Sequence, residues 1–205
     1  MKSKIAIYLA GSVKKGHEKT DESFWTEEDM AFLQTNLPEY KIAFLNPSFR
    51  ADNLSDNRSV FGRDMTQVFS SHLIFVDARD RRGLGVGAEM MWAKVNKIPV
   101  VTWSPKNSHY SKDLATLLGV PISNFIHPFV EILSDKIVQD LAEGAKWIHE
   151  MMSTPSFPIK GIEEITNAMQ YYKETQLHND TPMKELVAFS EELEERMCRV
   201  PPRMV

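Results

Sequence analysis

The chain has 205 residues, of which 42% are hydrophobic and 25% are charged, and its formal net charge is −4. This size is sufficient for one well-packed domain with an appendage, or for two small domains. The absence of a basic excess argues against a nucleic-acid polymer as a partner. No apolar run approaches the ~20 residues needed to span a bilayer, so we expect no contact with a membrane.

The only cysteine is Cys198, so no intrachain disulfide can form, as is typical of proteins of the reducing cytoplasm. The N-terminal residues run directly into a strand-like segment that is too short for the apolar region of a signal peptide. These two features predict a cytoplasmic protein.

Short apolar runs closed by turn residues predict strands at 5–10, 41–45, 73–77 and 99–103, with a short fifth strand at 124–126. Helices are predicted over 22–34, 60–70, 86–96 and 131–152. The polar segment 48–59 lacks periodicity and is predicted to be a mobile loop. This alternation favours an α/β fold with a Rossmann-like or flavodoxin-like parallel sheet of about five strands, flanked by helices.

The α/β domain is predicted to cover residues 1–152, and residues 153–205 to form a linker and a C-terminal helical extension. Two amphipathic helices are expected there, over 162–176 and from 181 onward. Thr181 is the predicted N-cap of the second helix, with Pro182 at its first position. We interpret them as a helical hairpin that packs on the domain or on a second subunit; a partner-binding appendage is the alternative.

Three glycines at two-residue spacing, Gly83, Gly85 and Gly87, lie between the strand at 73–77 and Glu89. Open parallel sheets bind ligands where such a turn opens a helix, and each glycine lets a ligand approach the backbone. Amides at a helix N-terminus help to keep a carboxylate ionised, so Glu89 is a candidate nucleophile. The alternative is a glutamate that only complements the helix dipole.

The loop after the first strand offers backbone amides, a hydroxyl and a lysine, which suit a phosphate group: Gly11, Ser12, Val13 and Lys14. It matches neither the Walker A motif nor the dinucleotide fingerprint, and the alternative is a solvated loop.

Other charged and aromatic residues have weaker claims. Asp64 lies on the helix before the third strand, where it can also be a surface residue or an ion-pair partner of Arg63. Asp77 can face the pocket or cap its turn, and Arg82 is near enough to the glycines to contact an anion. Trp25 can stack on a base or belong to the core. The six histidines show no metal-ligand spacing, so no metal is expected.

Three segments together resemble the nucleoside 2-deoxyribosyltransferase superfamily, over roughly residues 4–130. They are Tyr8-Leu9-Ala10-Gly11-Ser12, Arg63-Asp64-Met65 with the strand that follows it, and Gly85-Val86-Gly87-Ala88-Glu89. The nearest branch is that of the 2′-deoxynucleoside 5′-phosphate N-hydrolases and related nucleotide N-glycosidases.

The resemblance implies roles for individual residues. Glu89 matches the glutamate that attacks C1′ of the sugar, Asp64 an aspartate that serves the sugar or base, and Tyr8 a tyrosine that lines the site. Gly11, Ser12, Val13 and Lys14 match the loop on the phosphate side. Family members are usually homodimers or higher homo-oligomers, and Ser111 is the expected contribution from a neighbouring subunit.

The chain also departs from the family pattern. Where the phosphate-using branch has a serine and transferases have an aspartate, this chain has Gly83, which offers no side chain. Arg82 or backbone amides are the expected substitutes. Transferases often show Ala-Gly-Pro after the first strand, whereas this chain has Ala10-Gly11-Ser12, which favours the nucleotide branch.

The leading hypothesis is a nucleotide N-hydrolase that cleaves the N-glycosidic bond of (deoxy)nucleoside 5′-monophosphates through a glycosyl-enzyme on Glu89, without a cofactor. The alternatives are a nucleoside 2-deoxyribosyltransferase and a non-catalytic nucleotide-binding sensor. A phosphoribohydrolase of the cytokinin-activating type is a weaker reading, because its Pro-Gly-Gly-x-Gly-Thr pattern is absent.

Overall fold

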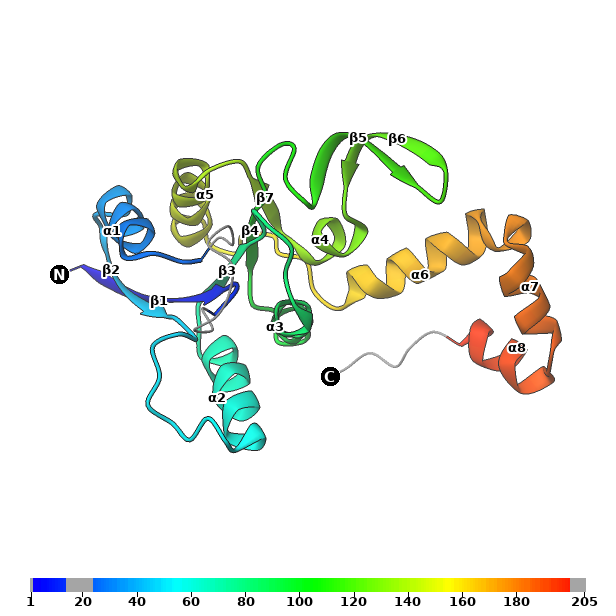
Figure 1. Ribbon diagram of the computed structural model, residues 1–205, viewed down its shortest axis with the longest axis horizontal. Coiled ribbons are helices and arrows are strands. Elements are labelled where there is room, and N and C mark those ends of the chain that lie inside the picture. The colour runs from blue at the N-terminus through cyan, green and yellow to red at the C-terminus, as the bar shows by residue number, and fades with distance from the viewer. Residues whose placement is uncertain (1, 14–23, 200–205) are drawn as a thin grey trace. The chain divides into compact units, whose positions relative to one another are not determined.

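The computed structural model describes residues 2–13 and 24–199. Within these residues the main sheet has five parallel strands in the order β2-β1-β3-β4-β7 (Figure 1). The strands are β1 (Ser3–Ala10), β2 (Tyr40–Leu45), β3 (Leu73–Asp77), β4 (Val100–Trp103) and β7 (Lys136–Val138). This is the strand order of flavodoxin-like sheets, and it confirms the predicted fold class.

Helices cover both faces of this sheet. α1 (Glu27–Asn36) and α5 (Leu141–Ser153) pack together on one face, while α2 (Asn57–Phe69) and α3 (Leu84–Val95) pack together on the other, with α4 (Pro128–Leu133) beside α3. Ile7 and Leu9 of β1 belong to the core under α1 and α5. Because side chains alternate along a strand, Tyr8 and Ala10 face α2 and α3.

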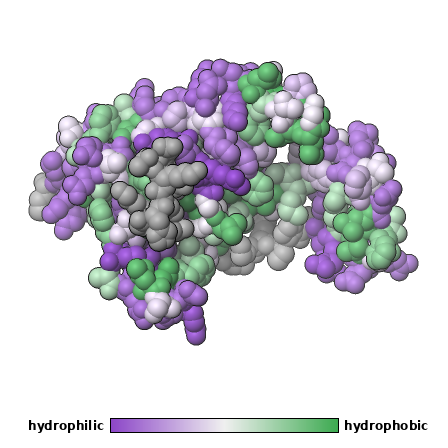
Figure 2. Space-filling model, in the orientation of Figure 1, coloured by the Kyte–Doolittle hydropathy of each residue, from purple (hydrophilic) through white to green (hydrophobic). Residues whose placement is uncertain are grey.

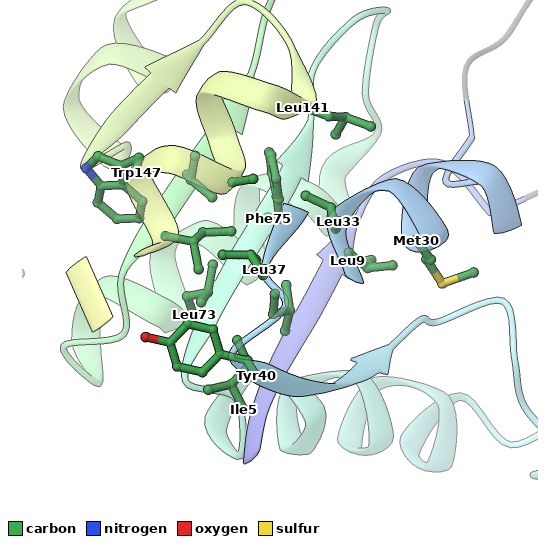
Figure 3. Packing of buried hydrophobic residues seen from close by; sticks show 14 of the residues in the cluster. Ile5, Leu9, Met30, Leu33, Leu37, Tyr40, Leu73, Phe75, Leu141 and Trp147 are labelled. Atoms are coloured by element: carbon green, nitrogen blue, oxygen red, sulfur yellow. The ribbon is translucent and has the colours of Figure 1, made fainter. Parts of the chain in front are cut away.

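The main hydrophobic core lies between the sheet and the pair α1 and α5 (Figure 3). Phe75 from β3 and Leu33 from α1 are fully buried in it. Helix α5 comes so close to β3 that a Cβ atom on Gly144 would lie 2.5 Å from Phe75 Cζ. Glycine is therefore required at this position by the close approach of the two elements.

The single helix predicted over 131–152 is wrong, because α4 ends at Leu133 and the strand β7 precedes α5. Ile137 continues the apolar spacing of a helix, yet it lies in β7 and pairs with Thr102 of β4. Asp140 begins α5, since its carboxylate accepts a hydrogen bond of 2.8 Å from the Glu143 amide. A strand of three residues is too short to show a period of its own.

The short fifth strand predicted at 124–126 does not join the main sheet. It is part of β6 (Val120–Ile126), which pairs antiparallel with β5 (Ser111–Leu117) in a separate two-stranded sheet. Leu118 and Gly119 connect the strands with positive φ angles of 49° and 83°, as in a type I′ turn. Hydrophobic side chains gather at the end of this hairpin (Figure 2), where Leu118 and Val120 are exposed.

Residues from Ile162 onward form a second compact unit. It holds α6 (Glu163–Thr175), the 3₁₀ helix η1 (Leu177–Asn179), α7 (Thr181–Ala188) and α8 (Glu191–Cys198). Thr181 lies inside α7, and the N-cap is Asp180, which accepts a hydrogen bond from the Met183 amide. The second predicted helix is interrupted before Ser190, which caps α8. No helix in the described ranges has the length and apolar character to span a bilayer.

Candidate active site

The carboxyl ends of β1 and β3 lie next to each other at one edge of the sheet, with Ala10 opposite Val76. The chain leaves β1 toward α1 on one face and leaves β3 toward α3 on the other (Figure 1). Open α/β sheets form a ligand-binding crevice at such a divergence. The residues after β1, the residues after β3 and the beginning of α3 therefore gather at the place where the sequence predicts a site.

Glu89 and Tyr8 form a buried hydrogen-bonded pair in this region. The Tyr8 hydroxyl donates a hydrogen bond of 2.8 Å to Glu89 Oε1, Tyr8 is fully buried, and Glu89 is only 7% exposed. The second carboxylate oxygen, Glu89 Oε2, is buried and accepts no hydrogen bond from the described residues. A buried polar atom without a partner is costly, and such atoms often mark a place that a ligand occupies.

Burial raises the pKa of Glu89 to about 7; the hydrogen bond from Tyr8 opposes this rise, and the charge of Asp64 adds to it. The sequence predicts that helix amides favour the ionised carboxylate, whereas burial here favours the protonated form. Helix α3 begins at Leu84, so Glu89 lies beyond its first turn, where the amides exert their effect. Near neutral pH both the carboxylate and the carboxylic acid are populated.

Asp64 lies on α2 between two arginines. Arg50 Nη1 is 3.4 Å from both carboxylate oxygens, and Arg63 Nη1 is 3.4 Å from Oδ1. The ion pair with Arg63, which the sequence offers as an alternative role, is thus present, together with one to Arg50 that the sequence did not suggest. Burial and the neighbouring Glu89 raise the pKa of Tyr8 most, and the charge of Asp64 adds to the rise at both Tyr8 and Glu89, so this carboxylate lies near enough to act on the pair. Three predicted site residues from β1, α2 and α3 are therefore brought together.

The three glycines keep space open at the start of α3. Gly83, the N-cap, has a φ of −79°, so no left-handed backbone requires a glycine there. A Cβ atom on Gly83 or Gly87 would meet nothing within 4 Å, whereas one on Gly85 would lie 3.9 Å from Glu89 Oε1. Gly85 is one turn before Glu89 on the same helix face, so its missing side chain leaves room beside the carboxylate.

The start of the loop after β1 is tied to the turn after β3 by Arg82. Arg82 Nη1 donates a hydrogen bond of 3.0 Å to Ser12 Oγ, Nε donates to the Asp77 carbonyl, and Nη2 lies 2.8 Å from Asp77 Oδ2. Arg79 also binds the Asp77 carboxylate, at 2.9 Å. Burial alone would raise the pKa of Asp77, but the hydrogen bonds from Arg79 and the charges of both arginines lower it. Asp77 thus contacts two guanidiniums, and Arg79 also lies 3.7 Å from Asp29 Oδ2. The Arg82 side chain is only 3% exposed, so it belongs to the buried part of this region.

Trp25 belongs to the core rather than to a base-stacking surface. Its indole donates a hydrogen bond of 3.0 Å to the Ala10 carbonyl, and its ring meets Phe75 edge-on at 5.1 Å. A Cβ atom on Gly11 would lie 3.2 Å from Trp25 Cδ1, so the chain leaving β1 fits closely against this ring. Val13 follows with 37% exposure, and Lys14 lies outside the described residues.

Ser111, the expected contribution from a neighbouring subunit, is the first residue of β5 and pairs with Ile126. A separate cavity of about 370 Å³ lies between α3 and α4, and its lining includes Gly83, Gly87 and Met90. Glu89 is not part of that lining, because it lies on another face of α3. Among residues 2–13 and 24–199, no cluster of three or more potential metal ligands is present.

Sequence reasoning missed Arg50, Asp52, Arg79 and Tyr110. Arg50 and Asp52 lie in the segment that was predicted to be a mobile loop, and Arg79 lies over the Trp103 ring at 3.8 Å. The Tyr110 hydroxyl accepts a hydrogen bond of 2.8 Å from the Arg82 amide. The sequence offers only one signal for these contacts, which is an arginine and an aspartate two residues apart in 50–52. That spacing does not indicate which helix the loop packs against.

No family model matches the chain, and no curated protein matches it. Among solved structures, a conserved protein from Enterococcus faecalis V583 is 14% identical, with a TM-score of 0.52 over 73% of this chain and 99% of that chain. A 2-deoxyribosyltransferase from Bacillus psychrosaccharolyticus is 15% identical, with a TM-score of 0.44 over 76% of this chain and 98% of that chain. The first of these likenesses shows a shared fold.

Proposed function

We propose that this protein cleaves the N-glycosidic bond of (deoxy)nucleoside 5′-monophosphates and releases the free base. The observation that carries the proposal is the Glu89 carboxylate, buried at the switch point of the sheet with one oxygen bound by Tyr8 and the other without a partner among the described residues. The sequence resemblance to the nucleoside 2-deoxyribosyltransferase superfamily, in which the matching glutamate is the nucleophile, supports the same role.

In the proposed reaction the ionised Glu89 attacks C1′ of the sugar while the bond from C1′ to the base nitrogen breaks. The bonding electrons leave with the base, which takes up a proton from the solvent, and an ester joins Glu89 to the sugar. Water then attacks C1′, the ester bond breaks to regenerate the carboxylate, and the proton that the water loses passes to the solvent. The Tyr8 hydroxyl fixes one oxygen of Glu89 and so leaves the other for the attack.

Asp64 is proposed to hold the substrate beside Glu89. Its neighbours Arg50 and Arg63 are hydrogen-bond donors, so its oxygens serve as acceptors. All these contacts are at 3.4 Å, which leaves Asp64 able to accept a shorter hydrogen bond from the sugar or the base.

The 5′-phosphate is proposed to bind at the loop after β1. Ser12 offers a hydroxyl that is bonded to Arg82, and this hydroxyl, the guanidinium and the backbone amides of the loop are groups that suit a phosphate. Arg82 thereby takes the place of the side chain that Gly83 lacks. Replacing Lys14 with alanine should raise KM for nucleotides and leave nucleosides largely unaffected; an equal loss on both would argue against a phosphate contact.

The test is base release measured by chromatography, with nucleosides, deoxynucleosides and their 5′-monophosphates, with and without an added free base. We expect free base from the monophosphates, and Glu89→Gln should reduce turnover on the order of 10³-fold, about 4 kcal/mol of barrier. Glu150→Gln, at an exposed position of α5, is the matched control. Near-normal turnover of a folded Glu89→Gln protein would refute the proposal.

The same assay separates the alternatives. A new nucleoside that forms only in the presence of an acceptor base would identify a 2-deoxyribosyltransferase. Nucleotide binding without any base release would identify a non-catalytic sensor.

A further inference from the structure

The segment 46–56 between β2 and α2 contains neither helix nor strand, yet it is fixed to α2 by side chains. Asn46 is buried, and its side chain accepts a hydrogen bond from the Ser48 amide. Arg63 of α2 donates a hydrogen bond of 2.6 Å to the Phe49 carbonyl. The segment is therefore held against the helix that carries Asp64.

Two arginines and two aspartates link this segment to α2. Arg50 bonds Asp52 through two nitrogens, at 2.8 Å and 2.6 Å, and reaches both oxygens of Asp64 with a third, at 3.4 Å. Arg63 contacts the same two carboxylates, at 3.7 Å and 3.4 Å. The Arg50 side chain is only 10% exposed, less than the other three.

The contacts of Arg50 differ in strength. The two short bonds to Asp52 form a planar, bidentate pair, which is the strong geometry for arginine and carboxylate. The hydrogen bond from Arg50 also lowers the pKa of Asp52 to about 2. The contacts to Asp64 are longer, so Asp52 fixes the Arg50 guanidinium, which then presents its charge to both oxygens of Asp64 from a fixed place.

We propose that Arg50, held by Asp52, is the positioning residue that places the Asp64 carboxylate beside Glu89 for substrate binding. This inference rests on the proposed function, because it concerns the residue assigned there to hold the substrate. Arg50 acts through Asp64 and does not need to touch the substrate. The segment 46–56, predicted from the sequence to be a mobile loop, is thus part of the site.

The test is a double-mutant cycle between Arg50 and Asp64, read as kcat and KM for base release. Arg50→Gln should lower kcat on the order of 100-fold, since small misplacements of a positioning group have effects of this size. In the Asp64→Asn background the same substitution should have almost no effect, because the residue through which it acts is already lost.

Arg50→Lys should restore part of the activity, because an ammonium can pair with Asp64 but cannot form the bidentate bond to Asp52. Asp52→Asn should lower kcat less than Arg50→Gln. Arg58→Gln, at an exposed arginine in the first turn of α2, is the matched control and should leave kcat unchanged.

Each outcome separates the two proposals. Full activity of Arg50→Gln, or an equal loss in both backgrounds, overturns the positioning role and leaves the proposed function intact, since equal losses would show that Arg50 acts without Asp64. A wild-type protein that releases no base overturns the proposed function and this inference with it.

Discussion

Replacing Glu89 with glutamine should make the stability of the fold less dependent on pH. The pKa of this carboxyl rises from 4.5 to about 7 in the fold, because burial disfavours the charged form. Relative to the ionised form, the protonated carboxyl therefore stabilises the fold, and this contribution is fully present below pH 4.5 and is lost as the pH rises through 7. At ~1.4 kcal/mol for each pH unit between these two values, the ionised side chain destabilises the fold by about 3 kcal/mol at high pH.

The assay is urea unfolding of the wild-type and Glu89→Gln proteins at pH 5 and pH 9. Between these values the wild type should lose about 2.5 kcal/mol more free energy of unfolding than the variant, since part of the effect is already present at pH 5. Groups that titrate in both proteins cancel in the comparison, and the glutamine oxygen can still accept the hydrogen bond from Tyr8. The same pH dependence in both proteins would show that Glu89 ionises without hindrance and would refute the reasoning.

Three further predictions concern the site and the fold. The acidic limb of the kcat/KM profile, which follows the ionisation of Glu89, should move to higher pH in Tyr8→Phe, because this variant loses a hydrogen bond to the buried glutamate. It should move to lower pH in Asp64→Asn, because that variant loses a repelling charge. Shifts of both profiles in the same direction would contradict this. In urea unfolding, Gly144→Ala should destabilise the fold by about 1–3 kcal/mol, because β3 comes so close to this position. Gly62→Ala lies in the interior of α2 with open space around it and should stabilise the fold by about 0.5–1 kcal/mol. Equal effects of the two substitutions would contradict the packing argument. Leu118→Asn should raise stability by about 1 kcal/mol, since an exposed leucine with positive φ is strained, and an unchanged thermal midpoint would count against that strain.

The order of strands and helices could be predicted because four strands of the main sheet are short apolar runs that end in turn residues. The position of Glu89 followed from the same reasoning, since a glycine-rich turn after β3 must lie at the carboxyl edge of the sheet. The protonation of Glu89 could not be predicted in this way. It depends on how deeply the carboxylate is buried, and burial is a property of packing rather than of the local sequence.

The elements that were missed carry little local signal. Strand β7 has three residues, and Ile137 within it fits the apolar spacing of the helix that follows. Arg50 gives no sign in the sequence that it reaches Asp64, because the contact joins residues 14 positions apart across an irregular segment. Such contacts depend on how a loop folds back on a helix, for which neither periodicity nor turn chemistry gives a rule.

The geometry around Glu89 depends on the register of β1. Ile7 and Leu9 fill the core under α1 and α5, so Tyr8 must point to the opposite face, where α3 presents Glu89. A shift of one residue in the pairing of β1 with β3 would place the tyrosine in the apolar core and Leu9 beside the carboxylate. The hydrophobic pattern that stabilises the sheet therefore also sets the hydrogen bond on which the proposed chemistry rests.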